Sequence, residues 1–161
     1  VRDRSIAARA DAIVVPNLAD PELISVGAEH YGAMCAGCHL APGLADNELR
    51  QGMYPRPPDL AMSMGRDPRE TFWIIKHGVK MSGMPAWGVT HDDDSIWGLV
   101  AFVQQLPTLS PAEYAASTGA LPSAGAHAHG GNEPHGEPGE PPVGGVNEHA
   151  HDHAAGAGHE H

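Results

Sequence analysis

The pentapeptide Cys35-Ala36-Gly37-Cys38-His39 constrains the fold of this chain more than any other segment. In a C-x-x-C-H motif, the two thiols add to the two vinyl groups of a haem, and the histidine brings an imidazole to the iron. An attached haem also supplies apolar bulk around which a small domain can fold. We therefore predict one covalently bound haem c, attached through Cys35 and Cys38, with His39 as its proximal ligand.

Two alternative roles of the motif each lack a required part. A thioredoxin-like redox pair would follow a strand, and a structural zinc ion requires four ligands, usually with a second cysteine pair. The chain contains only these two cysteines. A chance match of this spacing before a histidine is expected roughly once in a thousand such chains. Haem attachment is the interpretation that we retain.

The composition divides the 161 residues into a folded part and a tail. Residues 122–161 contain no Lys, Arg, Leu, Ile or aromatic residue. Burial of apolar side chains therefore cannot offset the entropy that this segment would lose on ordering. We predict a leader at 1–19, one folded domain at 20–115, and a disordered Gly/Pro/His-rich tail at 116–161.

The leader has two interpretations. It carries Arg2, Arg4 and Arg9 among small apolar residues, and the chain begins at Val1. Such a segment is consistent with the continuation of a membrane anchor that preceded Val1 and was removed. It is equally consistent with a solvated leader that frays at the edge of the domain. The sequence leaves both interpretations open.

Two predicted helices begin with the same signal, an aspartate followed by a proline. Asp20–Pro21 supplies an N-cap and a first-turn proline to a helix that continues into the haem motif. Asp67–Pro68 starts a shorter helix, and Gly78 provides its C-terminal cap. Apolar side chains recur at helical spacing in both segments, so we predict that one face of each helix is buried.

A third helix is predicted from Thr90 to Pro107, which stops it. Residues 92–94 are three aspartates in its first turn, where negative charge interacts favourably with the positive end of the helix dipole. A calcium site is the alternative role for three acids, but no EF-hand pattern of ligands follows them. We therefore predict that these aspartates cap the helix.

The order of these segments resembles that of the class I, mitochondrial-type monohaem cytochromes c over residues 20–108. In that family a glycine and an aromatic residue of the first helix pack against an aromatic residue of the last helix. Gly27, Tyr31 and Trp97 match these positions. The resemblance implies an all-α cytochrome c fold, with three main helices wrapped around one haem. It also implies a bacterial protein of the periplasm, since known cytochromes c receive their haem outside the cytoplasmic membrane.

The sixth ligand of the iron decides whether the haem relays electrons or reacts with a substrate. Met84 lies 45 residues after His39 in a G-M-P-A string that Pro85 stiffens. The family places its axial methionine in a very similar string. We therefore predict His39/Met84 ligation, with Met81 as the rival ligand. Such a centre has no open iron position, so we expect an electron-transfer protein and no enzyme.

Four further residues are candidate neighbours of the haem. By resemblance, Pro42 matches the proline whose carbonyl orients the second nitrogen of the histidine ligand. Tyr54 and Arg56 lie in a proline-rich loop suited to closing over a haem edge. Arg56 is either a partner for a haem propionate or a surface arginine. Trp87 either lines the pocket on the methionine side or serves packing alone.

The charge distribution bears on partners. The formal net charge is −11, yet residues 50–80 hold six of the nine basic side chains against three acids. This segment is either a modestly positive docking face for redox protein partners, an electron donor and an acceptor, or ordinary solvated charge. We expect no nucleic-acid partner.

The histidines of the tail are candidate ligands for divalent metal ions. Eight of the twelve histidines lie beyond residue 125, several of them two residues apart, as in His127-Ala128-His129. Residues at this spacing share one side of an extended chain, so each pair can chelate copper, nickel or zinc. The alternative is a solubilising tail that gains positive charge as its histidines are protonated.

Three functional classes follow from these observations. The first is a diffusible or tethered electron carrier, which needs only His39, Met84 and an exposed haem edge. The second is the haem subunit of a larger dehydrogenase or oxidase complex. The third is a haem enzyme or gas sensor, which requires a vacant or displaceable sixth ligand position. We favour the first class.

Overall fold

The computed structural model describes residues 2–119. These residues form seven α-helices and three short helical turns of other types, and no strand occurs among them. The predicted all-α class is therefore confirmed for this part of the chain. No helix in residues 2–119 is long and apolar enough to cross a membrane. The predicted tail from residue 120 onward, with its histidine pairs, lies outside the described residues.

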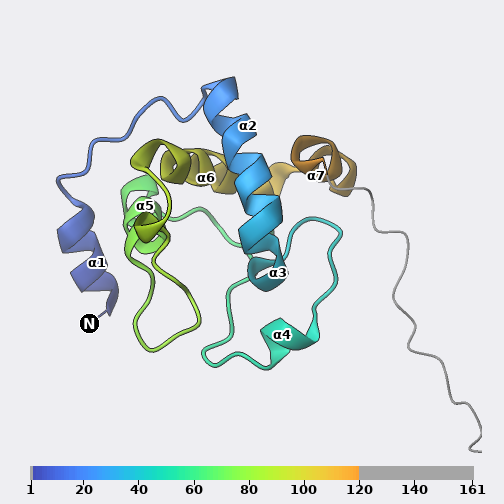
Figure 1. Ribbon diagram of the computed structural model, residues 1–161, viewed down its shortest axis with the longest axis horizontal. Helices are drawn as coiled ribbons and strands as arrows, with labels where there is room; N and C mark the ends of the chain where they lie inside the picture. The colour runs from blue at the N-terminus through green and yellow to red at the C-terminus, as the bar shows by residue number, and fades with distance from the viewer. Residues whose placement is uncertain (1, 120–161) are drawn as a thin grey trace, which may run out of the picture. The chain divides into compact units, whose positions relative to one another are not determined.

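The helical elements follow one another from the N-terminus (Figure 1). They are α1 (Arg2–Ala10), α2 (Pro21–His30), the π-helical turn η1 (Tyr31–Cys35), α3 (Ala36–His39), α4 (Glu48–Gln51), α5 (Pro68–His77), the 3-10 turn η2 (Trp87–Val89), α6 (Asp93–Gln105), the 3-10 turn η3 (Leu106–Thr108) and α7 (Pro111–Thr118).

The aspartate signals cap α2 and α5 as predicted. An Asp20 carboxylate oxygen accepts from the backbone N–H of Glu22 at 3.0 Å, and Asp67 accepts from the N–H of Arg69 at 2.8 Å. These bonds satisfy N–H groups that have no partner within their own helix. At the other end of α5, Gly78 adopts a φ of 66°, a conformation that favours glycine.

The third predicted helix begins later than expected. Its N-cap is Asp92 rather than Thr90, because the Asp92 carboxylate accepts from the backbone N–H of Ser95 at 2.9 Å. Asp93 and Asp94 then occupy the first turn of α6. The prediction that these acids cap a helix is confirmed.

Two glycines allow α2 and α6 to cross at close range (Figure 1). A Cβ atom on Gly27 would lie 1.9 Å from the carbonyl oxygen of Gly98. A Cβ atom on Gly98 would lie 2.9 Å from the carbonyl oxygen of Leu23. No side chain fits at either position, so the predicted role of Gly27 is confirmed. Gly98, its counterpart, was not singled out in the sequence.

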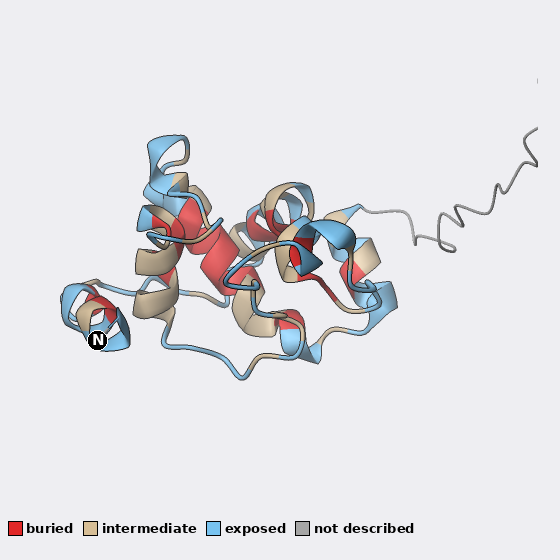
Figure 2. Ribbon diagram, turned by 90° about the horizontal axis from the view of Figure 1, so that it is seen from below, coloured by how far each residue is buried: buried red, intermediate tan, exposed pale blue. Residues whose placement is uncertain are grey.

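The core is built around α6, and Figure 2 shows the buried positions gathered in the middle of the folded part. Tyr31 is fully buried, and its ring lies 5.5 Å from that of Phe102 between centroids. Trp97 instead stacks on Phe72 of α5 at 4.2 Å. The family pattern had paired Tyr31 with Trp97. Phe102 takes this place because it lies four residues after Gly98 and so shares the crossing face of α6.

At the two ends of the described residues, α1 and α7 extend the fold beyond the three helices that were predicted. Residues 2–10 of the expected leader form α1, which packs beside α5 with Ile6 and Ala10 buried. At the other end, α7 begins with a capping box between Ser110 and Glu113. It ends at Thr118, three residues beyond the boundary predicted at 115.

Candidate haem-binding site

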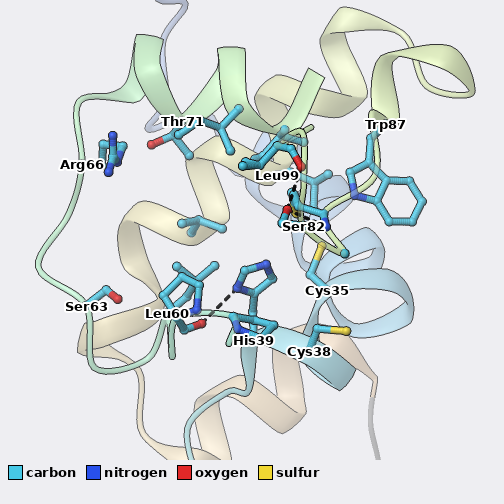
Figure 3. A pocket seen from close by; sticks show the side chains of 18 of the residues that line it. Cys35, Cys38, His39, Leu60, Ser63, Arg66, Thr71, Ser82, Trp87 and Leu99 are labelled. Atoms are coloured by element: carbon cyan, nitrogen blue, oxygen red, sulfur yellow. Dashed lines mark hydrogen bonds between the residues drawn. The ribbon is translucent and has the colours of Figure 1, made fainter. Parts of the chain in front are cut away.

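The C-x-x-C-H motif lies where α2 passes through η1 into α3. Cys35 ends η1, and Cys38 and His39 belong to α3. Residues three and four apart share one side of a helix, and all three side chains line a single cavity (Figure 3). Burial raises the pKa of the Cys35 thiol to about 12, so this thiol is protonated at neutral pH.

The cavity has a volume of about 570 Å³, which is within the usual range for small-molecule and cofactor sites. Its lining is mainly apolar and comes from most of the described elements. Apolar contributors include Ile6 of α1, Tyr31 and Met34 of η1, Leu60 of the loop between α4 and α5, Ile74 and Ile75 of α5, and Leu99 and Val103 of α6.

His39 is oriented through one of its ring nitrogens. Its Nδ1 lies 3.0 Å from the carbonyl oxygen of Pro58. A carbonyl can only accept, so Nδ1 carries the proton and Nε2 keeps its lone pair. Burial lowers the pKa of His39, with a smaller contribution from the positive charge of Arg50, and the bond to Pro58 opposes both effects. The ring is therefore a neutral imidazole, which is the form that ligates iron.

The prediction that Pro42 supplies this carbonyl is wrong. Pro42 does not line the cavity, because the chain turns away after Leu40, whose φ is 59°. The chain returns along the motif later, where the backbone N–H of Leu60 donates to the carbonyl oxygen of His39 at 3.0 Å. This contact brings Pro58 beside the imidazole. The proline-rich loop was recognised in the sequence, but Pro58 was not assigned this role.

Arg50 supports the same loop and was missed in the sequence. It is 9% exposed. Its Nε donates to the carbonyl oxygen of Pro57 at 3.1 Å, and its Nη1 donates to Asp46 at 2.9 Å. Arg50 therefore fixes the residue that precedes Pro58. No motif surrounds Arg50, and the only local signal is Asn47, which caps the short helix α4 that carries it.

Met84 and Met81 occupy different environments. Met84 is partly buried and lines the cavity. Met81 is 95% exposed and does not line it. The loop between them is held by Ser82, whose hydroxyl donates to the carbonyl oxygen of Val79 at 2.7 Å and accepts from the N–H of Met84 at 3.2 Å. The structure thus brings Met84, and not its rival, to the cysteines and His39.

Other methionines also reach the cavity. Met34, Met53 and Met64 line it together with Met84. A Cβ atom on Gly83 would lie 2.1 Å from the methyl carbon of Met53, so Gly83 leaves the space that this side chain fills. The sequence interpretation of Met53 as a packing residue agrees with this position.

The remaining candidate residues divide between the cavity and the surface. Trp87 lines the cavity (Figure 3), and its ring lies 5.6 Å from that of His91 between centroids. Arg56 also lines the cavity, but its guanidinium pairs with Asp46. Tyr54 is 97% exposed and lies outside the lining. The flanking residues Met53 and Pro55 contact the cavity instead.

The locally basic segment is largely neutralised within the fold. Five of its six basic side chains form ion pairs: Arg50 and Arg56 with Asp46, Arg66 with Glu70, Arg69 with Asp67, and Lys76 with Asp93. Each pair cancels charge at short range. This arrangement favours the interpretation as ordinary solvated charge over that of a positive docking face.

The donor groups fit a covalently bound haem. Two thiols, a neutral imidazole with a free Nε2 and several thioethers, among them Met84, line a mainly apolar cavity. Within residues 2–119, no group of three or more His, Cys, Asp or Glu side chains is arranged to hold a metal ion. The cavity is therefore better suited to a prosthetic group than to a bare ion.

Comparison with known proteins agrees with this chemistry. Residues 22–103, just over half of the 161, match the model of a family described as cytochrome c oxidase, cbb3-type, subunit III. No curated protein and no solved structure showed significant similarity to the chain. The matched range contains the C-x-x-C-H motif, Pro58 and Met84. The chain belongs to the family of cbb3-type cytochrome c oxidase subunit III and carries its haem-based, electron-transferring cytochrome c domain.

Proposed function

We propose that this protein is a monohaem c-type cytochrome that carries single electrons between redox proteins of the periplasm. When bound, haem supplies an iron that gains and loses one electron. The observation that carries the proposal is that His39 and Met84 line the same apolar cavity as the two cysteines. The cysteines would hold the haem, and the other two side chains would ligate its iron.

The protein residues have distinct tasks in this proposal. The carbonyl of Pro58 keeps the proton of His39 on Nδ1 and so presents Nε2 to the cavity. Ser82 bonds to the backbone on both sides of its loop and so restricts Met84. A thioether ligand paired with an imidazole would raise the potential by favouring ferrous iron. With His39 and Met84 both ligating the iron, the site would not bind a substrate there.

The test compares two methionines of one loop. In the haem-loaded protein, Met84→Ala should abolish the visible-spectrum signature of His/Met iron, because it removes the thioether that we propose as the ligand. Met81→Ala is the matched control and should retain the signature, since Met81 is exposed outside the cavity. Loss of the signature in Met81→Ala with retention in Met84→Ala would reverse the assignment.

A second candidate function is that of a haem subunit in an oxidase complex. The family description, which names a subunit of an oxidase, favours it. The same residues serve both roles, so purification distinguishes them. A complex predicts that the native protein co-purifies with other subunits at a fixed stoichiometry, whereas a carrier elutes alone.

Failure of the reduced protein to bind carbon monoxide would exclude a haem enzyme or gas sensor with an accessible iron.

A further inference from the structure

The helix α1 forms part of the cavity wall. Arg2, Asp3 and Ile6 line the cavity, and Ile6 is buried. This helix lies outside residues 22–103, which match the family. The matched domain alone therefore does not complete the cavity wall, and α1 supplies the missing part.

Contacts along its length hold α1 against the domain. They are Asp3 Oδ1 to Arg66 Nη1 at 3.7 Å, the Arg9 guanidinium to the Trp73 ring centroid at 6.0 Å, and Arg69 Nη1 to the carbonyl oxygen of Asp11 at 3.4 Å. Such exposed contacts are individually weak. Together with the burial of Ile6 and Ala10 against α5 they fix the position of a short helix.

The wall that α1 supplies lies near the side of the cavity away from the cysteines. In Figure 3, Arg66 and Ser63 are on one side of the cavity, and Cys35 and Cys38 are on the other. The same oxygen of Asp3 lies 3.7 Å from Arg66 Nη1 and 3.7 Å from Arg2 Nε. Two guanidinium groups therefore meet on this far side, with one carboxylate between them.

The chemistry of haem matches this division. Haem carries its two vinyl groups on one edge and its two carboxylates on the opposite edge. A haem joined to both cysteines would thus direct its carboxylates toward the side where Arg66 lies. Arg66 also pairs with Glu70 at 2.9 Å, so Arg2, Arg66, Asp3 and Glu70 together carry no net charge. What suits a carboxylate edge is the two guanidinium groups themselves, whose N–H donors can bind carboxylate oxygens. Arg56, the sequence candidate for this role, pairs with Asp46.

We propose that α1 covers the carboxylate edge of the haem, where Arg2 and Arg66 bind the carboxylates and Ile6 excludes water beside them. This inference rests on the proposed function, because it requires a haem in the cavity. Positive charge beside the haem favours the reduced state, since reduction lowers the charge of the iron. Removing Arg2 therefore lowers the midpoint potential.

The experiment compares two arginines of the same helix in the haem-loaded full chain. Arg2→Gln removes a guanidinium whose side chain is 66% exposed, so the fold does not depend on it. Arg4→Gln is the control, because Arg4 is exposed on the same helix and does not line the cavity. We expect Arg2→Gln to lower the midpoint potential and to speed amide hydrogen exchange in residues 2–10, with neither change in Arg4→Gln.

Each outcome decides the proposal. Equal shifts in both variants would reflect net charge alone and would overturn a contact between Arg2 and the haem, as would an unchanged potential in Arg2→Gln. Ile6→Ser should also lower the potential by admitting water, and an unchanged value would refute the covering role of α1. The spectrum of the unmodified protein is recorded first. Absence of the His/Met signature there overturns the proposed function, whereas a normal signature with no effect at Arg2 overturns only this inference.

Discussion

Replacing Gly27 with alanine tests the glycine crossing on which the arrangement of α2 and α6 depends. The added Cβ would lie 1.9 Å from the carbonyl oxygen of Gly98 and 2.3 Å from its carbonyl carbon. Ordinary van der Waals contact begins at 3.4 Å, so 3.4 minus 1.9 gives a separation of about 1.5 Å that the helices must gain. Both clashing atoms belong to a backbone, which cannot adopt another rotamer.

The expected loss of stability follows from two opposing effects. Overpacking in a well-packed core costs about 1–3 kcal/mol, and the absence of a flexible neighbour puts this site at about 3 kcal/mol. Gaps opened along the rest of the interface contribute to this cost. Alanine is favoured over glycine in a helix by about 1 kcal/mol. The free energy of unfolding should therefore fall by about 2 kcal/mol.

Urea unfolding of the haem-loaded protein, followed by circular dichroism, measures this difference. With a urea dependence of about 2 kcal/mol per molar, the midpoint should fall by roughly 1 M. Gly37→Ala is the matched control, because a Cβ at Gly37 meets no atom within 4 Å. If the Gly27 variant were as stable as the control, the close approach of the two backbones would be refuted.

Three further predictions concern other parts of the chain. Arg50→Met should lower the free energy of unfolding by about 2 kcal/mol, because it removes the bonds that Arg50 makes to Pro57 and Asp46; an unchanged urea midpoint would contradict this. The bonds from Arg69 lower the pKa of Asp67 from 3.8 to about 2, so Asp67 stabilises the fold above pH 3.8 and less as the pH falls toward 2. The difference in the free energy of unfolding between the native protein and Asp67→Ala should therefore shrink as the pH falls over that range. A difference that does not change with pH would contradict the lowered pKa of Asp67. We also propose that the histidine pairs of the tail bind copper with micromolar affinity. A chain that ends at Leu121 should lose this binding, and binding only at millimolar concentration would argue for a solubilising tail.

Local signals in the sequence predicted the elements that depend on neighbouring residues. The capping aspartates Asp20 and Asp67 act within two residues of themselves, so their helices were predictable from short segments. The haem motif was equally local, because its thiols and imidazole lie within five residues. Gly27 was recognised through a family pattern whose physical basis is a helix crossing.

The supporting contacts of the site depend on where the chain returns, and the sequence did not reveal them. Pro58 contacts His39 although the two residues are 19 positions apart in the sequence. Pro42 was the wrong choice because the backbone turns away at Leu40, although Pro42 is close to His39 in the sequence. Arg50 acts through a neighbouring loop rather than on the cavity. The packing of α1 on α5 joins segments more than fifty residues apart, and its two buried residues, Ile6 and Ala10, form too short an apolar pattern to predict it.

The π-helical turn η1 has a consequence for how this sequence can change. A single residue inserted into a helix, or removed from it, rotates everything beyond it by about 100°. The turn joins α2, which is locked at its glycine crossing, to α3, and it ends at Cys35. A deletion within 31–34 would swing Cys38 and His39 away from the cavity while leaving the C-x-x-C-H motif itself intact. The length of this turn is therefore as strongly constrained as the identities of its buried residues Tyr31 and Cys35.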